Sequence, residues 1–434
     1  MRRIAQAGAL LAAVSLLATA CGSGGDTADT DKNTAPAPEK VSGSLTWWDT
    51  SDPTNEGPAF DKLVKKFEAK YPDVTIDHQY VPFDEAQNKF KTAAEAKKGA
   101  PDILRAEVAW VPEFASLGYL YSLDGTAALE DKSDYFETPL SSNVFNGKTY
   151  GIPQVTDSLA LLYNKKLFKQ AGIDSAPSTW AEVAEDAKLL KSKAGVDGIF
   201  LNPAGYFLLP FIYGEGGDLV DTQAKQIVVN SDANVEGVSE AQKLIDEGAA
   251  PKPPASDAYT AMMTAFTEGK VGMIINGPWE VNNIRNAENF GGVENLGIAP
   301  VPAGSKTAGA PVGGHNYVVW SGMDQSKADA ATAFITFMNS AESQAFLADE
   351  LGLLPTRKSA YQIPSVAQNP VISAFKPVID SAVARPWIPE GGQFFTALDT
   401  MAVETMVQGK DAKSSLDKAA KTYKSDVVPD YSLK

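Results

Sequence analysis

From Leu45 onward, short strand-like runs alternate with longer runs of helical periodicity, and this alternation restricts the folds open to the chain. The run "SLTWW" predicts a first strand, and the apolar residues from Phe60 to Phe67 that follow it lie at helical spacing. Alternation of this kind is typical of proteins in which helices cover the faces of a sheet. We therefore predict an α/β fold.

The alternation is interrupted by a predicted tight turn and then begins again. The segment "FNGKTYGIP", residues 145–153, contains the Asn-Gly pair that favours a hairpin. Beyond it, Thr179 and Glu182 have the spacing of a capping box at a helix start. Strands are predicted over 74–81, 101–107, 157–164, 198–202, 271–276 and 316–320, and helices over 84–98, 109–118, 178–195 and 258–270, with mostly helix after about Lys327. Two α/β units joined by more than one crossing of the chain fit this order best.

The N-terminus has the character of an export signal. A basic start is followed by a small, apolar run that ends "LLATAC", which is too short to span a membrane. We predict a signal peptide over residues 1–20. The segment resembles a bacterial lipoprotein signal, which implies that Cys21 is lipidated and becomes the new N-terminus. Ala18 departs from that pattern, which most often has Leu there, and the alternative is an ordinary signal peptide with a stray thiol.

The segment after Cys21 has the composition of a linker. Residues 22–43, "GSGGDTADTDKNTAPAPEKVSG", contain almost no large apolar side chains, so they cannot bury enough surface to order themselves. We predict a disordered tether over residues 21–43, able to extend roughly 70 Å at about 3.3 Å per residue.

Charge and composition exclude several functions. The chain has 54 acidic and 38 basic residues, a formal net charge of -16, which argues against binding nucleic acid, since that depends on neutralising phosphates. The chain has one Cys and two His, which are too few to favour a His/Cys metal site or a hydrolase triad. The P-loop and HExxH patterns are absent from the sequence. No metal, cofactor or intrachain disulfide is expected. A pair of carboxylates for glycoside hydrolysis stays open, because acidic residues are so numerous.

The aromatic residues suggest a ligand instead. "WWDTSD" places Trp48 and Asp49 at the end of the first strand, and "RAEVAW" places Glu107 and Trp110 at a strand-to-helix turn. In "INGPWEVNN" a tryptophan, Trp279, follows a Gly-Pro helix start directly. Ligands bind at the carboxyl ends of strands in α/β sheets. Because a sugar ring offers an apolar face and a rim of hydroxyls, aromatic rings beside charged groups suit a carbohydrate.

Several longer motifs carry a family resemblance. They are "GAPDILRAEVAWVPEFASLGYL", "YGIPQVTDSLALLYNKKLF", "AFTEGKVGMIINGPW", "GLLPTR" and "RPWIPEGGQFF". In this order the chain, from Leu45 to its end, resembles the extracellular solute-binding proteins of ABC sugar importers, in the maltose/maltodextrin-binding group. The resemblance implies a two-lobed periplasmic-binding-protein-like fold with three hinge crossings and a ligand cleft. It places the first lobe at 44–154 plus 314–355 and the second at 158–311 plus 360–434.

The resemblance also implies a set of sugar-binding residues. Trp279 and Tyr206 match stacking residues of the second lobe, and Asp157 matches an acidic hinge residue. Trp48 and Asp49 are added from their place at the end of the first strand and not from the resemblance. The full predicted set is Trp48, Asp49, Glu107, Trp110, Asp157, Tyr206, Trp279, Arg385, Trp387 and Phe395. Phe395 stands where the family often has a tryptophan. The "DTSDPTNEG" loop does not match the family, which leaves the ligand roles of Asp49 and Asp52 open. It also stays open whether residues 312–316 line the cleft or only pack a hinge.

These observations predict a receptor without chemistry of its own. It would be a monomer, anchored outside the cell through Cys21, that binds maltose or maltodextrins and delivers them to the membrane subunits of an ABC permease. The alternatives are a secreted glycosidase and the same fold binding another oligosaccharide, an amino acid, a polyamine or an iron chelate.

Overall fold

The computed structural model describes residues 40–434. The predicted signal peptide, Cys21 and most of the predicted tether therefore lie outside the described residues. The end of the tether prediction is wrong, because Val41 is buried in an apolar core and the first strand begins at Gly43. Among the described residues, no helix combines the length and apolar character needed to cross a membrane.

The first lobe is built on a five-stranded mixed sheet. Its strands, in spatial order, are β2 (Val74–Tyr80), β1 (Gly43–Asp49), β3 (Ile103–Glu107), β13 (Val312–Val319) and β6 (Gly151–Ser158). β1 pairs in parallel with β2 and β3, whereas β13 runs antiparallel to β3 and β6. A small hairpin, β4 (Val144–Phe145) and β5 (Lys148–Thr149), turns at the predicted Asn-Gly pair. The helices are α1 (Gly57–Lys70), α2 (Phe83–Glu95), α3 (Trp110–Ser116), α4 (Glu137–Ser141), α11 (Gln325–Met338) and α12 (Ala341–Leu351).

Helices cover both faces of this sheet, as two neighbouring tryptophans of β1 show. Trp47 points to the side of α1 and α11, where it packs against Phe60 and Phe334. Trp48 points to the opposite side, into a core that includes Phe90 of α2. Parallel sheets are generally buried on both faces in this way, and here that arrangement hides both indoles.

The second lobe is built on a four-stranded sheet. Its strands, in spatial order, are β12 (Leu296–Ala299), β7 (Ala160–Asn164), β11 (Val271–Asn276) and β8 (Asp197–Phe200). A further small sheet contains β14 (Ser432–Leu433), β10 (Gln226–Ile227) and β9 (Val220–Asp221). The helices are α5 (Lys165–Ala171), α6 (Trp180–Leu189), α7 (Gly205–Gly214), α8 (Asp232–Asp246), α9 (Ala258–Thr267), α10 (Val281–Asn286), α13 (Pro364–Ala367), α14 (Pro370–Asp380), α15 (Phe394–Ala402) and α16 (Ala412–Thr422). Thr179 caps α6 as predicted, since its hydroxyl accepts the amide of Glu182.

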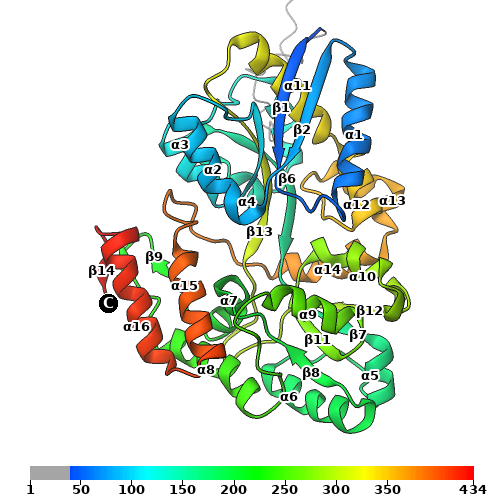
Figure 1. Ribbon diagram of the computed structural model, residues 1–434, viewed down its shortest axis with the longest axis vertical. Coiled ribbons are helices and arrows are strands. Elements are labelled where there is room, and N and C mark those ends of the chain that lie inside the picture. The colour runs from blue at the N-terminus through cyan, green and yellow to red at the C-terminus, as the bar shows by residue number, and fades with distance from the viewer. Residues whose placement is uncertain (1–39) are drawn as a thin grey trace, which may run out of the picture. The chain divides into compact units, whose positions relative to one another are not determined.

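The chain passes between the two sheets three times, and Figure 1 lets the reader follow the passages. They occur at Leu159, between β12 and β13, and after α12. Helix α12 belongs to both cores, because Leu347 lies in a core of the first lobe while Ala348 lies in a core of the second that includes residues of α10 and α14. The predicted α/β fold is confirmed.

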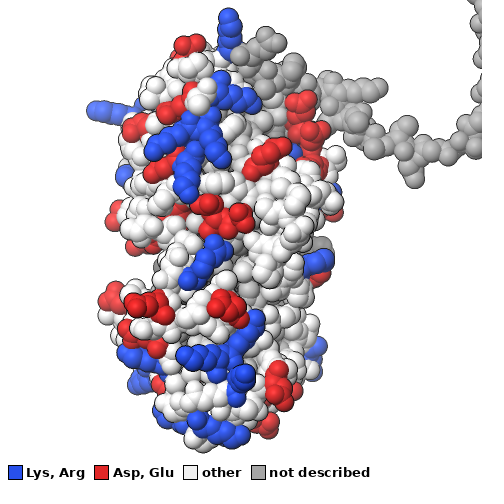
Figure 2. Space-filling model, turned by 90° about the vertical axis from the view of Figure 1, so that its right-hand side faces the viewer, with Lys and Arg blue, Asp and Glu red and all other residues white. Residues whose placement is uncertain are grey.

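Charged residues are distributed without a dominant sign on the face shown in Figure 2. Basic side chains gather in the upper part and again in the lower part of this view, and acidic side chains lie between and beside them. A broad basic surface of the kind that nucleic acid requires is not seen on this face.

Candidate ligand-binding site

Arg385 is the centre of the group that contains most of the predicted residues. It lies in the segment between α14 and α15, and its buried guanidinium donates through Nε to the carbonyl oxygen of Val312 at 2.9 Å. Nη2 bonds Oε1 of Glu107, the last residue of β3. Its central carbon lies 5.6–5.7 Å from the ring centres of three aromatic residues, Tyr206, Trp387 and Phe395. This single side chain therefore contacts residues of both lobes.

Asp157 and Tyr206 converge at Gly313. Gly313 is the register partner of Asp157 in the β6–β13 ladder. A Cβ on this glycine would lie 2.2 Å from Oδ1 of Asp157 and 2.7 Å from the hydroxyl of Tyr206. The absence of a side chain at Gly313 thus leaves room for the carboxylate and the phenol beside β13. Val312 and Gly313, two residues of the 312–316 segment, therefore lie beside Arg385, Asp157 and Tyr206.

Burial governs the charge of Asp157. Removal from water, together with the nearby carboxylate of Glu107, raises the pKa of Asp157 to about 7, although Arg385 acts in the opposite direction. Glu107 is held in place by Arg385 and by the backbone amide of Ala109 at 2.8 Å. The two carboxyl groups therefore differ, because one is paired with a cation and the other is half protonated near neutral pH.

Trp279 lies at the start of the helical segment after β11, as predicted. Its ring folds over Gly277, where a Cβ would lie only 1.9 Å from the ring. Nε1 donates to the hydroxyl of Tyr259 at 2.8 Å, and the ring packs on the core of the second lobe while staying partly exposed. The Gly-Pro sequence therefore serves two purposes: Pro278 begins a short 3-10 turn, and Gly277 makes room for the indole.

A row of aromatic rings connects Trp279 with the Arg385 group. Ring centres are 6.0 Å apart for Tyr259 and Phe207, 5.9 Å for Phe207 and Tyr206, and 6.0 Å for Tyr206 and Phe395. Tyr259 and Phe207 were not predicted, because nothing in the local sequence separates them from ordinary helix residues. Only the tertiary fold brings α7 and α9 beside the predicted residues.

Trp387 and Trp110 lie where the two lobes meet. Nε1 of Trp387 donates to the hydroxyl of Ser141 in α4 at 3.0 Å. Trp110 opens α3 and is largely buried, and a Cβ on Gly392 would lie 3.4 Å from its Cδ1. The segment before α15 therefore passes directly over the start of α3.

Trp48 and Asp49 do not join this group. Trp48 is 5% exposed within a core, its Nε1 donates to Gln79 at 3.1 Å, and Lys89 covers its ring at 4.5 Å. The expectation that Trp48 faces a ligand is therefore wrong, because a helix covers this face of the sheet too. Asp49 is fully buried and accepts hydrogen bonds from Ser51 and His78. Burial would raise the pKa of Asp49, but the bond from His78 and the charge of Arg105 outweigh it and lower that pKa.

Asp52, whose role was left open, accepts hydrogen bonds within its own turn. Its Oδ1 accepts the amide and hydroxyl of Thr54, both at 2.7 Å, and the amide of Asn55 at 2.9 Å. These bonds shape the loop between β1 and α1. Oδ1 of Asp52 therefore fixes the turn that carries Asn55.

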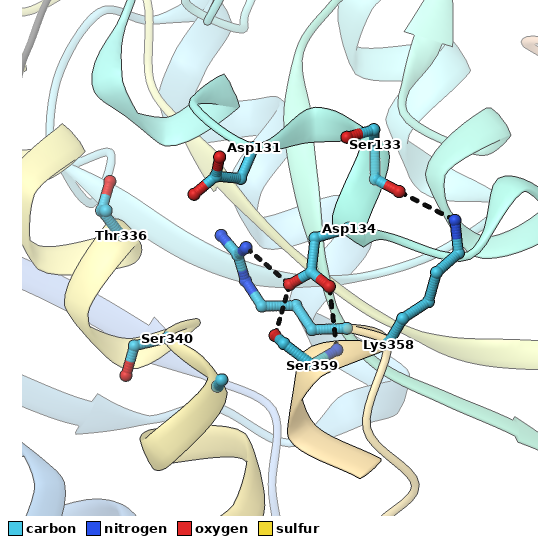
Figure 3. A pocket seen from close by; sticks show the side chains of 9 residues that line it. Asp131, Ser133, Asp134, Thr336, Ser340, Lys358 and Ser359 are labelled. Atoms are coloured by element: carbon cyan, nitrogen blue, oxygen red, sulfur yellow. Dashed lines mark hydrogen bonds and ion pairs between the residues drawn. The ribbon is translucent and has the colours of Figure 1, made fainter. Parts of the chain in front are cut away.

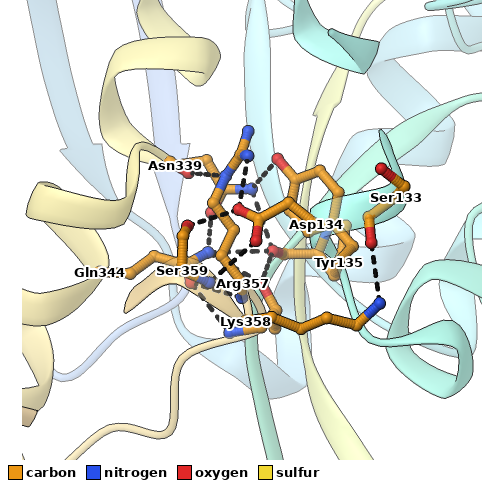
Figure 4. A network of polar contacts seen from close by, with 10 residues as sticks. Ser133, Asp134, Tyr135, Asn339, Gln344, Arg357, Lys358 and Ser359 are labelled. Atoms are coloured by element: carbon orange, nitrogen blue, oxygen red, sulfur yellow. Dashed lines mark hydrogen bonds and ion pairs between the residues drawn. The ribbon is translucent and has the colours of Figure 1, made fainter. Parts of the chain in front are cut away.

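A hollow of about 590 Å³ lies elsewhere on the molecule and contains none of the ten predicted residues. Its polar side chains bond one another (Figure 3), as when Ser359 donates its hydroxyl to Oδ2 of Asp134 at 2.5 Å. In the network of Figure 4, Arg357 bonds Oδ2 of Asp134 at 3.1 Å and the carbonyl oxygen of Asn339 at 2.7 Å. We interpret these hydrogen bonds as contacts that anchor the segment after α12 to the first lobe.

Metal binding has no support in the part of the chain that the structure describes. Within residues 40–434, no group of three or more His, Cys, Asp or Glu side chains is arranged to hold an ion. The arrangement around Arg385 suits a neutral, hydroxyl-rich ligand, because rings and hydrogen-bonding charges alternate there.

Comparison with known proteins identifies the family. The sequence profile described as "Bacterial extracellular solute-binding protein" matches residues 50–345, more than half of the chain. The chain belongs to this family of solute-binding proteins.

A solved structure similar to this solute-binding protein is the GacH receptor of Streptomyces glaucescens GLA.O, determined unliganded and with acarbose and an acarbose homolog. The two are 41% identical, with a TM-score of 0.86 and coverage of 90% of this chain and 100% of that chain. The maltotriose-binding protein of Pyrococcus abyssi is 25% identical over 393 residues, which are 89% of this chain and 82% of that protein. The diacetylchitobiose binding protein of Streptomyces coelicolor is 28% identical over 371 residues, 85% of each. The predicted resemblance and the two-lobed fold are confirmed.

Proposed function

We propose that this solute-binding protein binds α-glucosyl oligosaccharides of the maltose and maltodextrin type between its lobes. The observation that carries the proposal is a charged group framed by aromatic rings. Its charges belong to Arg385, Glu107 and Asp157, and its rings to Tyr206, Trp387 and Phe395.

Each part of this group suits one part of a sugar. The apolar face of a glucosyl ring stacks on an aromatic plane, and its hydroxyls bond to charged groups at the rim. Asp157 is well suited to a hydroxyl, because a carboxyl group with a pKa near 7 can donate a proton as well as accept one. A ligand without hydroxyls would leave these buried groups unpaired, which gives specificity.

Binding would be coupled to closure of the lobes. Glu107 belongs to the first lobe and Tyr206 to the second, so a sugar that contacts both stabilises the closed arrangement. We propose that the closed, loaded protein delivers its sugar to the membrane subunits of an ABC permease. We also propose that it is a monomer, tethered by a lipid on Cys21 outside the cell membrane, with the hinge at the three chain passages.

The choice of α-glucosyl sugars draws support from two similar proteins. GacH was solved with acarbose, itself an oligosaccharide analogue, and the Pyrococcus abyssi relative is a maltotriose-binding protein. The Streptomyces coelicolor relative is a diacetylchitobiose binding protein, so an N-acetylated disaccharide is the sugar to test against them.

We propose that the protein has no catalytic activity. One observation favours a glycosidase: Asp157 with a raised pKa lies near a second carboxylate, Glu107, a contrast that glycosidases use. However, Glu107 is already held by Arg385 and by the Ala109 amide, which leaves it poorly placed to attack or to activate water.

Calorimetric titration of residues 40–434 tests the proposal. The ligands would be maltose, maltotriose, acarbose, diacetylchitobiose and lactose, and the recovered sugars would be checked for free glucose. We expect binding of the α-glucosyl sugars alone, with the sugars intact. Binding only to diacetylchitobiose would replace the proposed ligand, and released glucose would establish the glycosidase.

A further inference from the structure

Phe83 is a large aromatic residue whose exposure calls for an explanation. It is the first residue of α2, and 49% of its surface is exposed. Buried residues of the same helix occur at Ala86, Phe90 and Ala94, so Phe83 continues their stripe by one helical turn. It is exposed because α2 begins beyond the carboxyl end of β2, where the sheet no longer covers it. Phe83 therefore overhangs the sheet edge at which the ligand site lies.

Two aromatic partners hold the ring of Phe83 in place. Its centre lies 5.2 Å from Trp110, with the planes inclined by 33°, and 5.9 Å from His315, edge to face. Trp110 begins α3 just as Phe83 begins α2, so two neighbouring helices each supply a ring at the carboxyl ends of their strands. A ring supported on two sides loses little freedom when a ligand covers its open face.

The surroundings of Phe83 connect it to the proposed sugar site. Gly392, in the segment that follows Arg385 and Trp387, approaches both Trp110 and Gln87 closely. Beside it, Glu113 accepts hydrogen bonds from Gln87 at 2.7 Å and from Gln393 at 3.4 Å. An aromatic platform with polar side chains at its border is the arrangement that we proposed for the central group.

We propose that Phe83 forms an outer subsite that stacks on a glucosyl unit of longer oligosaccharides, beyond the units held at the Arg385 group. The proposal rests on the proposed function, since it assigns the length preference of the same site. Phe83 adds one stacking contact that short sugars are not long enough to reach.

The test is a titration of the Phe83→Ala, Phe83→Trp and Phe83→Leu variants of residues 40–434 with maltose, maltotriose, maltotetraose and maltopentaose. Loss of one stacking contact should weaken the longest sugar about tenfold in Phe83→Ala and leave maltose within about twofold. Phe83→Trp should keep the affinity, whereas Phe83→Leu should lose it, because a flat face is needed. Phe136→Ala is the matched control, since Phe136 is 38% exposed and packs on Tyr361 in another part of the chain.

Each other outcome overturns the inference. An equal loss for every sugar length would make Phe83 a support for Trp110, and no loss would make it an ordinary exposed side chain. Failure of the unaltered protein to bind any of these sugars would instead refute the proposed function, so the two failures are distinguishable.

Discussion

The side-chain amide of Asn55 donates a hydrogen bond to the carbonyl oxygen of Trp279 at 3.2 Å, across 224 residues of sequence. Asn282 donates in turn to Oδ1 of Asn55 at 2.8 Å. Asn55 lies in the loop between β1 and α1, whereas Trp279 and Asn282 follow β11. One small amide thus joins the first lobe to the helix start that presents the predicted sugar platform.

Replacement of Asn55 should weaken this contact between the lobes. Asn55→Ala removes both bonds. At about 1 kcal/mol each, we expect a loss of sugar affinity of up to roughly thirtyfold, with a larger radius of gyration in the ligand-free state. Small-angle scattering and calorimetry measure the two effects. Thr54→Ala is the control, because the Thr54 hydroxyl bonds only within its own loop. Unchanged scattering and affinity would show that the hydrogen bonds of Asn55 contribute nothing to closure of the lobes.

Trp279→Ala should reduce sugar affinity more than stability. The ring is partly exposed, and its loss removes a stacking face worth about 2 kcal/mol, or roughly thirtyfold in affinity. Calorimetry and thermal unfolding would be measured on the same samples. Trp279→Phe should restore part of the affinity. A steep fall in melting temperature in place of the affinity loss would mean that Trp279 is a core residue.

Asp157→Asn should change how stability depends on pH. The pKa of Asp157 is raised from 3.8 to about 7, so between these pH values the folded protein holds a proton that the unfolded chain releases. Stability from this group is therefore lost as the pH rises from about 4 to about 7, by up to about 4 kcal/mol at about 1.4 kcal/mol per pKa unit.

Thermal unfolding from pH 4.5 to 8.5 measures this loss. The Asn variant should gain stability over the unaltered protein progressively toward pH 8, whereas variation of the exposed Asp73 to Asn should not. Burial lowers the pKa of His78, but Asp49 and Asp61 outweigh burial and raise that pKa. His78 therefore also contributes stability that is lost as the pH rises. The difference between Asp157→Asn and the unaltered protein isolates the carboxyl group. Parallel pH profiles would contradict the assignment.

Trp48→Ala should behave in the opposite way to Trp279→Ala. Removal of a buried indole leaves a cavity and costs about 3–5 kcal/mol of stability. Urea unfolding would show this as a lower midpoint. The fraction that stays folded should bind sugar with unchanged affinity, since Trp48 faces a helix and no ligand. A loss of affinity at constant stability would reinstate the original expectation for Trp48.

The elements of the fold could be predicted from the sequence wherever periodicity is local. The strands at 43–49 and 271–276 and the capped helix at Trp180 follow directly from apolar spacing and turn residues. The run 157–164 was predicted as one strand, but it is divided at Leu159 between β6 and β7, which belong to different sheets. Both halves are apolar and buried, so nothing in the local pattern marks the division.

The candidate site could be predicted only in part, for a similar reason. Glu107, Tyr206 and Arg385 were named from the resemblance, and the fold brings them together. The burial of Trp48 could not be foreseen, because alternation along a strand assigns two faces but does not say that both are covered. The exposure of Phe83 could not be predicted from the sequence, because it depends on where the sheet ends beneath α2.

The pairing of β6 with β13 has a mechanical consequence. The chain leaves the first lobe along β6 and returns along β13, and the two strands are bonded to each other from Gly151 to Ser158. Because the two strands are bonded along their length, we infer that they bend together. The second lobe would then turn mainly near Leu159 and Pro311, where the ladder ends, and at the third passage, after α12. On this inference, the motion of the two lobes is described largely by one angle. Because Cys21 is the only cysteine and precedes the described residues, a pair of engineered cysteines, one on each lobe, would read that angle as a single dye-to-dye distance.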